Sequence, residues 1–455
     1  MNPQILASSA LLPSGWHRNV AIEIDAQGRI AHVTPESSAR GPRTGPLIPA
    51  PANLHSHAFQ RAMAGLTEAR GPDRHDSFWT WRQQMFRFLD RLTPEDVQAI
   101  TAFVQMEMQE AGFASVGEFH YLHHTPGGVA YADPAEMSAR ICAAAAQTGI
   151  GLTLLPVLYP VGGLDRRPLG PGQIRFGQTP DSFADLLTAC APLIAALPAD
   201  AHLGVAPHSL RAVTAEGLQT AIALAGDRPL HMHLAEQQAE VEEVLAHTGA
   251  RPVEHLLAQT DITPNWCLIH CTQMTPRETR ALAQTGAVAG LCPITESSLG
   301  DGIFDAPRFL AAGGRFGLGS DSNIRISLAE ELRTLDYSQR LRDRARAVLA
   351  TPDRSTGRRL IEDAATGGAQ ALGRGTGRIE TGQWADLAGL AQGHTDLIGR
   401  QGDRVLDTLM VTGDNRMIRD LWCAGRHMVC AGRHIHRAAI TRAYRATMRR
   451  LKDAM

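Results

Sequence analysis

The pattern of apolar and polar residues changes twice along the chain. Residues from about 17 to 35 have the alternation and turn signals of short strands. From Leu47 onward, short apolar runs of strand type alternate with longer stretches of helical periodicity, such as Pro94 to Gly112 and Ala235 to Thr248. After about residue 372, closely spaced glycines again divide the chain into short strand-like segments. The pattern predicts two strand-rich ends around a long region of alternating strands and helices.

The central region contains eight runs of strand type. They lie at about residues 47–54, 113–119, 151–158, 202–207, 229–234, 266–270, 287–292 and 315–320. Eight repeats of strand and helix predict an α/β fold with a (β/α)8 TIM-like barrel. We assign the barrel to residues 49–371. Residues 1–48 and 372–455 are expected to pair into a small β-sandwich domain, with a helix at the C-terminal end.

Composition excludes several classes of function. The 455 residues are 44% hydrophobic and 20% charged. The formal net charge of -2 does not indicate binding to nucleic acid or to a membrane surface. The basic stretch from Arg433 to Lys452 is expected to be an amphipathic helix with a solvated face. We find no apolar run long enough to span a bilayer and no basic region of a secretory signal at the start. Seven cysteines are sparse for this length, so we expect a reduced, cytoplasmic protein.

Polar residues gather where the predicted strands end, which is where such barrels carry their chemistry. These residues are His55 and His57, His120 and Tyr121, His208, His231 and His233, His270, and Ser320 and Asp321. His55 and His57 are two apart on an extended segment, so both imidazoles point into the barrel mouth. Alone, this spacing is a weak signal in a chain with 19 histidines, and His231 and His233 repeat it. Further candidate ligands at separate strand ends favour a metal site.

These residues follow a known order. An H-x-H on the first strand, single histidines on the fifth and sixth and an aspartate on the eighth resemble the amidohydrolase superfamily. His233-Leu-Ala-Glu236 resembles the H-x-x-E signature of its deaminase branch, and the stretch from Ala365 to Leu387 is also typical of these enzymes. The resemblance implies a five-coordinate metal site made of His55, His57, His233, Asp321 and a water.

The expected number of metal ions depends on a lysine. Many members of the superfamily bind two ions, bridged by a carboxylated lysine at the end of the fourth strand. Here Lys452 is the only lysine in the sequence, and His208 stands at the end of the predicted fourth strand. We therefore expect one ion per chain. Zinc suits these nitrogen and oxygen ligands, and iron or manganese also fits them.

Four longer motifs are similar to a branch of the superfamily that hydrolyses formimino groups. They are Asn53 to Met63, Phe78 to Arg82, His231 to Gln237 and Gly319 to Asn323. That branch implies hydrolytic deimination of N-formimino-L-glutamate to N-formyl-L-glutamate and ammonia, a step of histidine degradation. The expected partner is thus a small dicarboxylate that carries a formimino group, and the chain is expected to form a homodimer, as is common among relatives.

The same resemblance implies a set of substrate-binding residues: Gln60, Arg82, Tyr121, His208 and Arg211. Arginine suits a carboxylate because its planar fork binds both oxygens at once. Residue type alone leaves other roles open. Arg82 could stack on the aromatic residues around it, Tyr121 could be a core residue with a satisfied hydroxyl, and Gln60 could cap a loop.

Three residues are the candidates for the chemistry. The expected mechanism is attack of a metal-bound hydroxide on the formimino carbon. Asp321 would take the proton of the water, and Glu236 would deliver a proton to the departing nitrogen. His270 is expected to be a neutral imidazole that orients or deprotonates the water, or else a fifth ligand or a support for one. Two other functions stay open: deamination of a guanine- or adenosine-like substrate, and a catalytically inactive metal-binding relative.

Overall fold

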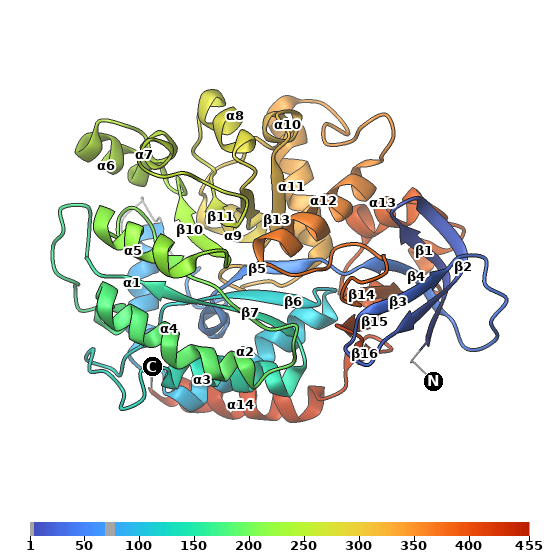
Figure 1. The fold of residues 1–455 in the computed structure, drawn as a ribbon, viewed down its shortest axis with the longest axis horizontal. Coiled ribbons are helices and arrows are strands. Elements are labelled where there is room, and N and C mark those ends of the chain that lie inside the picture. Colours follow the sequence, from blue (N-terminus) through green and yellow to red (C-terminus); the bar gives the residue numbers. More distant parts are fainter. Residues whose placement is uncertain (1–3, 69–77, 455) are drawn as a thin grey trace.

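The predicted barrel forms, with helices packed around its strands (Figure 1), and two bridges close it. The computed structural model describes residues 4–68 and 78–454. Its barrel strands are β5 (Ala52–Ser56), β6 (Ser115–His120), β7 (Gly151–Leu158), β8 (His202–Leu203), β9 (Ala206–Pro207), β10 (Leu230–Leu234), β11 (Trp266–His270), β12 (Val288–Leu291) and β13 (Arg315–Leu318). They run parallel in the order β10-β11-β12-β13-β5-β6-β7-β8, with β9 also paired to β7. Parallel bridges Val205–Leu230 and Ser209–His233 join the fourth strand position back to β10.

Helices surround the barrel, and three of them begin at a Thr-Pro pair. The helices are α1 (Phe78–Leu89), α2 (Pro94–Glu110), α3 (Glu136–Thr148), α4 (Pro180–Ala195), α5 (Ala215–Ala225), α6 (Gln238–Thr248), α7 (Pro252–Gln259), α8 (Pro276–Gln284), α9 (Pro293–Leu299), α10 (Ala306–Ala311), α11 (Leu328–Asp343), α12 (Thr356–Ala371), α13 (Asp403–Thr412) and α14 (Arg437–Ala454). Before α2, α4 and α8, the side chains of Thr93, Thr179 and Thr275 accept a backbone hydrogen bond from the first turn. The following proline suits the first helical position, so these helices start sharply.

The two ends of the chain pair into one mixed sheet, which confirms that both ends together build the small β-domain. Its strands are β1 (Gln4–Leu12), β2 (Gly15–Ile24), β3 (Ile30–Thr34), β4 (Thr44–Pro49), β14 (Leu387–Leu390), β15 (Ile418–Cys423), β16 (Arg426–Cys430) and β17 (Arg433–His434). Their order is β17-β16-β15-β14-β4-β1-β2-β3, and β14 pairs with β4 across the two ends. The sheet lies beside the barrel, on the right in Figure 1.

Three of the predicted segments differ from the structure, and one of them, the run at about 202–207, is divided into the two short strands β8 and β9. The run at about 47–54 is not one strand, because β4 ends at Pro49 in the small sheet and β5 begins at Ala52 in the barrel. Leu47 and Leu54 are both buried, but in different hydrophobic clusters, so the apolar run crosses from one core to another. The helix predicted from Ala235 begins only at Gln238. Ala235 has a φ of 50°, a left-handed conformation that ends β10 and delays the helix.

A buried charge network connects the barrel to the small sheet. Arg374, just after α12, lies 3.2 Å from Asp200 and 2.9 Å from Asp386. Arg426 of β16 donates to both Asp200 oxygens, at 2.9 and 2.8 Å. Because Arg374 and Asp386 are fully buried, each charge depends on its partners for compensation. Separately, none of the helices in the described ranges is long and apolar enough to cross a membrane.

Candidate active site

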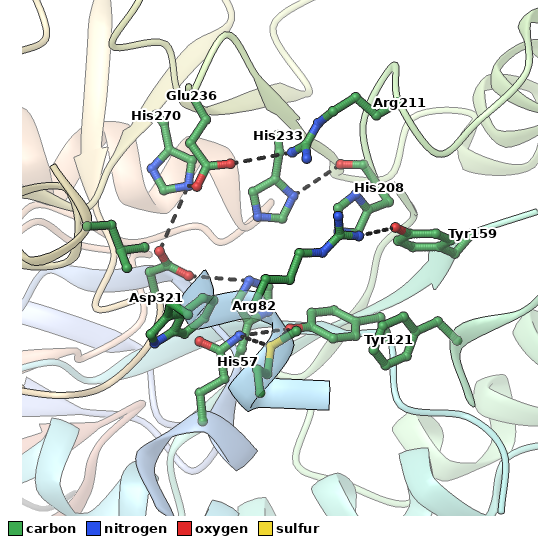
Figure 2. A pocket seen from close by; sticks show the side chains of 15 residues that line it. His57, Arg82, Tyr121, Tyr159, His208, Arg211, His233, Glu236, His270 and Asp321 are labelled. Carbon is green, nitrogen blue, oxygen red and sulfur yellow. Dashed lines mark hydrogen bonds and ion pairs between the residues drawn. The ribbon is translucent and has the colours of Figure 1, made fainter. Parts of the chain in front are cut away.

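The residues predicted for the site, except the buried His55, line one pocket at the C-terminal ends of the barrel strands (Figure 2). The predicted members of its lining are His57, Gln60, Arg82, Tyr121, His208, Arg211, His233, Glu236, His270 and Asp321. The lining also includes Trp81, Met85, Tyr159, Phe176 and Leu299, which were not predicted. Tyr159 directly follows β7, so the rule that found the other residues at strand ends would have found it as well.

Three histidines form a cluster that could hold a metal ion. One ligand nitrogen from each of His55, His57 and His233 lies within 4.8 Å of the others. Asp321 Oδ1 lies 3.6 Å from His55 Nε2 and 3.3 Å from His57 Nε2. His55 is completely buried, and neither of its ring nitrogens has a hydrogen-bond partner among the residues that the structure describes. A buried imidazole without partners fits a metal ligand, because an uncompensated polar atom would otherwise be costly.

Backbone carbonyls orient two of these rings. His57 Nδ1 lies 2.9 Å from the Phe119 carbonyl oxygen, and His233 Nδ1 lies 3.1 Å from that of His208. The Nε2 atom of each ring is therefore left to face the cluster, which is the usual arrangement around a metal. Burial lowers the pKa of His57 to about 3 and holds the pKa of His233 well below its ordinary value. Both rings are thus neutral, the form in which imidazole binds a metal.

A polar network joins the end of β5 to the end of β13 and was not predicted. The Asn53 side chain donates to Ser320 Oγ at 2.6 Å, and Ser320 Oγ donates to Asn323 Oδ1 at 2.6 Å. Asn323 in turn donates to Ser56 Oγ at 3.1 Å and to the His57 carbonyl at 3.2 Å. This network holds the strand that carries the histidine pair against the strand that leads to the aspartate.

Glu118 of β6 supports the same loop from behind. Its Oε1 accepts a hydrogen bond of 2.7 Å from the Ala58 backbone N–H, directly after His57. The side chain is buried, and burial raises its pKa to about 8 despite this hydrogen bond and one from Ser56. Glu118 is therefore mainly uncharged at neutral pH.

His270 lies among three carboxylates on the far side of Asp321. Its Nδ1 lies 3.2 Å from Glu296 Oε1, and its Nε2 lies 3.8 Å from both Glu236 Oε1 and Asp321 Oδ2. Burial opposes a charge on the ring, but these carboxylates raise its pKa to about 10. The carboxylates thus favour a charged ring, and the neutral imidazole expected from the sequence stays a prediction. Burial also raises the pKa of Asp321, to about 7, and the neighbouring glutamates add to the shift while His270 opposes it.

The two predicted arginines approach the pocket from different elements. Arg211 Nη2 lies 3.6 Å from Glu236 Oε2, and both side chains are almost completely buried. Arg82, on α1, donates a hydrogen bond of 2.6 Å to the Tyr159 hydroxyl, and its guanidinium carbon lies 5.1 Å from the centre of the Phe86 ring. The expected stacking on an aromatic ring and the expected approach to the pocket therefore occur together. The side chains of Phe78 and Trp79, named with Arg82 in the sequence, lie outside the described residues.

The remaining predicted substrate residues lie on the pocket wall. Gln60 Nε2 donates to the Tyr121 hydroxyl at 2.8 Å, so both side chains are partnered and face the pocket. The ring of His208 meets that of Tyr159 edge-on, with centroids 4.6 Å apart, and its Nδ1 lies 2.9 Å from Ser209 Oγ. These contacts keep the polar atoms of the wall in fixed positions.

Two other candidate ligands do not join the histidine cluster. His231 is buried, and its Nε2 lies 2.7 Å from the Ala371 carbonyl oxygen, which places it deeper in the barrel. The Cys292 thiol lies within 4.8 Å of His270 and Asp321 ligand atoms. Burial raises the pKa of this thiol well above its ordinary value, so the metal-binding thiolate is disfavoured.

Comparisons with known proteins agree with this geometry. Residues 47–428 match the amidohydrolase family, and residues 3–42 match the family described as formimidoylglutamate deiminase HutF, N-terminal domain. The chain is 47% identical to a formimidoylglutamate deiminase of Pseudomonas aeruginosa over 454 residues, which cover 99% of each chain.

Solved structures show the same fold. An amidohydrolase from Brucella melitensis superposes with a TM-score of 0.93 at 46% identity and covers 98% of this chain and 99% of its own. An adenosine deaminase from Xanthomonas campestris, solved with bound zinc, shares only the fold, with a TM-score of 0.81 at 21% identity over 99% of this chain and 98% of its own. By these matches the chain belongs to the amidohydrolase family and groups within it with the formimidoylglutamate deiminases.

Proposed function

We propose that the protein hydrolyses N-formimino-L-glutamate to N-formyl-L-glutamate and ammonia, a step in histidine degradation. One observation carries this proposal: two arginines, Arg82 and Arg211, line the same pocket as the histidine cluster and Asp321. A substrate with two carboxylates needs two such cations near the reacting centre. The similarity to the Pseudomonas aeruginosa formimidoylglutamate deiminase, over the full length of both chains, supports the same substrate.

One zinc ion per chain would be held by His55, His57, His233 and Asp321. The neutral state of the histidine rings and the unpartnered nitrogens of His55 support this ligand set. Such an ion would supply Lewis-acid polarisation and a water of lowered pKa at neutral pH. The single lysine, Lys452, lies in the C-terminal helix α14, away from the fourth strand position, which supports one ion rather than two. Iron or manganese would use the same ligands.

The side chains around the cluster would move the protons. Asp321 directs Oδ1 toward the histidine pair and Oδ2 toward His270, so Oδ2 can accept the proton of the attacking water. His270 holds that oxygen from one side and is itself fixed by Glu296. The water oxygen then adds to the formimino carbon, and the electron pair of the C=N bond moves to the nitrogen.

Glu236 would complete the reaction by protonating the leaving nitrogen. Its carboxylate lies 3.8 Å from His270 Nε2 and 3.6 Å from Arg211 Nη2. It therefore lies between the group that would accept the water proton and the arginine that would bind a substrate carboxylate. From there its carboxylate can take the remaining proton of the added water oxygen and pass it to the terminal nitrogen as the C–N bond breaks and ammonia leaves. The carbon keeps the oxygen of the water and becomes the formyl group.

A substrate comparison tests this proposal. The zinc-loaded protein is assayed for ammonia release from formiminoglutamate, guanine and adenosine at equal concentrations. We expect turnover of formiminoglutamate at least about 1000-fold more efficient, since a neutral nucleobase offers no carboxylate to the two arginines that line the pocket. Faster turnover of either nucleobase compound would instead support a nucleobase deaminase, and no turnover of any amidine would support an inactive relative.

We also propose a cytoplasmic homodimer. All seven cysteines are free, and six are buried, which suits a reducing compartment. The dimer rests on the family resemblance alone. Light scattering of the purified protein would report a mass near twice 49.0 kDa if the dimer forms and near 49.0 kDa if it does not.

A further inference from the structure

Tyr159 is a buried tyrosine at the wall of the pocket that none of the roles above uses. It follows β7, its side chain is 2% exposed, and it lines the pocket. Figure 2 shows its hydroxyl directed at the guanidinium group of Arg82, close to His208. A buried tyrosine can contribute only the packing of its ring. The hydrogen bonds of the Tyr159 hydroxyl therefore decide whether it can also bind a ligand.

The Tyr159 oxygen accepts two hydrogen bonds. Arg82 Nη2 donates to it at 2.6 Å, and Gln173 Nε2 donates to it at 2.9 Å. A phenol has one proton and two acceptor positions, so these two donors fill the acceptor positions. Among the described residues, no acceptor takes the Tyr159 proton. Tyr121 differs, because its oxygen accepts from Gln60 while its own proton faces the Met85 sulfur at 3.5 Å.

The hydrogen bonds of Gln173 fix which atom of its side-chain amide faces Tyr159. Its Oε1 accepts from the Gly170 backbone N–H at 3.0 Å, which leaves its amide nitrogen to donate to Tyr159. The guanidinium group is also obliged to donate. Neither neighbour can therefore reverse its hydrogen bond and accept the phenol proton, which must be given to a third group.

We infer that the Tyr159 hydroxyl is a further donor to the substrate, and that it binds the side-chain carboxylate together with Arg82. This inference rests on the proposed function. Arg211 is paired with Glu236 at the reacting end, so it suits the α-carboxylate, which is attached next to the formimino nitrogen. The side-chain carboxylate lies three carbons farther along the substrate and needs donors away from Glu236. Arg82 and Tyr159 supply such donors side by side.

Direct binding tests the inference without turnover. Calorimetry would compare zinc-loaded wild type and Tyr159→Phe with two ligands, N-formyl-L-glutamate and N-formyl-L-norvaline, which lacks the side-chain carboxylate. We expect Tyr159→Phe to weaken binding of the first ligand by about tenfold to a hundredfold, the usual effect of losing a hydrogen bond to a charge. Binding of the second ligand should stay within about twofold. An equal loss for both ligands, or no loss for either, would overturn the inference.

Kinetics and matched variants distinguish a hydrogen bond to the substrate from a packing role of the Tyr159 ring. With formiminoglutamate, Tyr159→Phe should raise KM and leave kcat within about threefold, and its effect should shrink in an Arg82→Met background, because both residues act on one carboxylate. Tyr337→Phe, which removes the hydroxyl of an exposed tyrosine on α11, is the control and should change neither constant. A full additive loss in the double variant would contradict a shared carboxylate. Absence of formiminoglutamate turnover by the wild type would count against the proposed function alone, since the calorimetric result stands without it.

Discussion

The Arg211 guanidinium lies 3.6 Å from the Glu236 carboxylate, and both side chains are buried in the pocket wall. The residue proposed to bind a substrate carboxylate is thus ion-paired with the residue proposed to deliver the proton. Glu240 reinforces the pair, because its Oε2 accepts the Glu236 backbone N–H at 2.9 Å and its charge acts on Arg211. Substrate binding and proton delivery are therefore coupled in one small cluster.

Replacing Arg211 should weaken substrate binding strongly. In Arg211→Met the Glu236 carboxylate loses its ion pair and the substrate loses a bidentate donor, so kcat/KM for formiminoglutamate should fall about 100-fold or more. Arg211→Lys is the matched variant, because it keeps the charge but not the fork, and it should recover only part of the loss. Steady-state kinetics measure both. Unchanged constants in Arg211→Met would remove this residue from the site.

Replacing Glu236 should affect the chemical step instead. Glu236→Gln keeps the shape and the contact with Arg211 but cannot give up a proton as a carboxylic acid does. We expect kcat to fall about 100-fold or more while KM changes little. Zinc content measured on the same preparation provides the control, since the variant should retain its metal. A Glu236→Gln enzyme with full metal and near-normal turnover would refute the role.

The protonation state of Glu118 leads to a different prediction. Because burial raises its pKa to about 8, the neutral acid predominates at pH 7 and an amide should replace it well. We expect Glu118→Gln to bind zinc nearly as the wild type does. Glu118→Ala, which leaves the Ala58 N–H without its acceptor, should weaken zinc binding about tenfold to a hundredfold. Competition with a chelator measures both affinities, and equal affinities for the two variants would contradict the support of the loop by Glu118.

The same pKa has a consequence for stability. With a pKa of about 8, Glu118 keeps its proton in the folded protein up to about pH 8. In the unfolded chain the same side chain releases its proton near the ordinary pKa of about 4.3. The wild type therefore loses stability as the pH rises from about 4.3 to 8. Relative to the wild type, the melting temperature of Glu118→Gln should rise over this range, and a constant difference would contradict the raised pKa.

Much of this architecture follows from the sequence because it depends on local pattern. His55 and His57 could be placed in one cluster because side chains two apart on a strand share a face. The strand at about 47–54 was predicted wrongly because Leu47 and Leu54 are equally apolar, although they pack in different cores. The periodicity of apolar residues indicates that a residue is buried, but not in which hydrophobic core it packs.

Residues that act through tertiary contacts were not accessible from the pattern. Asn323 reaches Ser56 across 267 positions, and the acceptor role of Tyr159 depends on Arg82 and Gln173 from two other segments. The raised pKa of His270 likewise comes from Glu236 and Glu296, which only the fold brings to it. Contacts of this kind can be recognised only once the positions of the strand ends in space are known.

The charge network between barrel and small sheet should control acid stability. Although burial opposes the charge on Asp200, hydrogen bonds from Arg426 and the charge of Arg374 keep its pKa below the ordinary value. The stabilisation is thus present above about pH 4, the unfolded-state value, and is lost as the pH falls through the lower folded value. Asp200→Asn leaves Arg374 undercompensated, so it should destabilise the fold at pH 7 by about 3 kcal/mol.

Thermal unfolding at two pH values tests this network. The difference in melting temperature between wild type and Asp200→Asn should be largest at pH 7 and should shrink below pH 4, where the wild-type aspartate also takes up a proton. Asp343→Asn is the control, since this aspartate sits on the surface at the end of α11 and away from the network. An equal difference at both pH values would show that the charge of Asp200 contributes nothing.

The most direct test of the central claim is to determine which C–N bond of the substrate breaks. Formiminoglutamate labelled with ¹³C at the formimino carbon is incubated with the zinc-loaded enzyme and followed by ¹³C NMR. Protonation of the terminal nitrogen by Glu236 predicts release of ammonia and a labelled formyl group that stays on glutamate. Labelled formamide together with free glutamate would mean that the other C–N bond breaks and would contradict the proposed reaction.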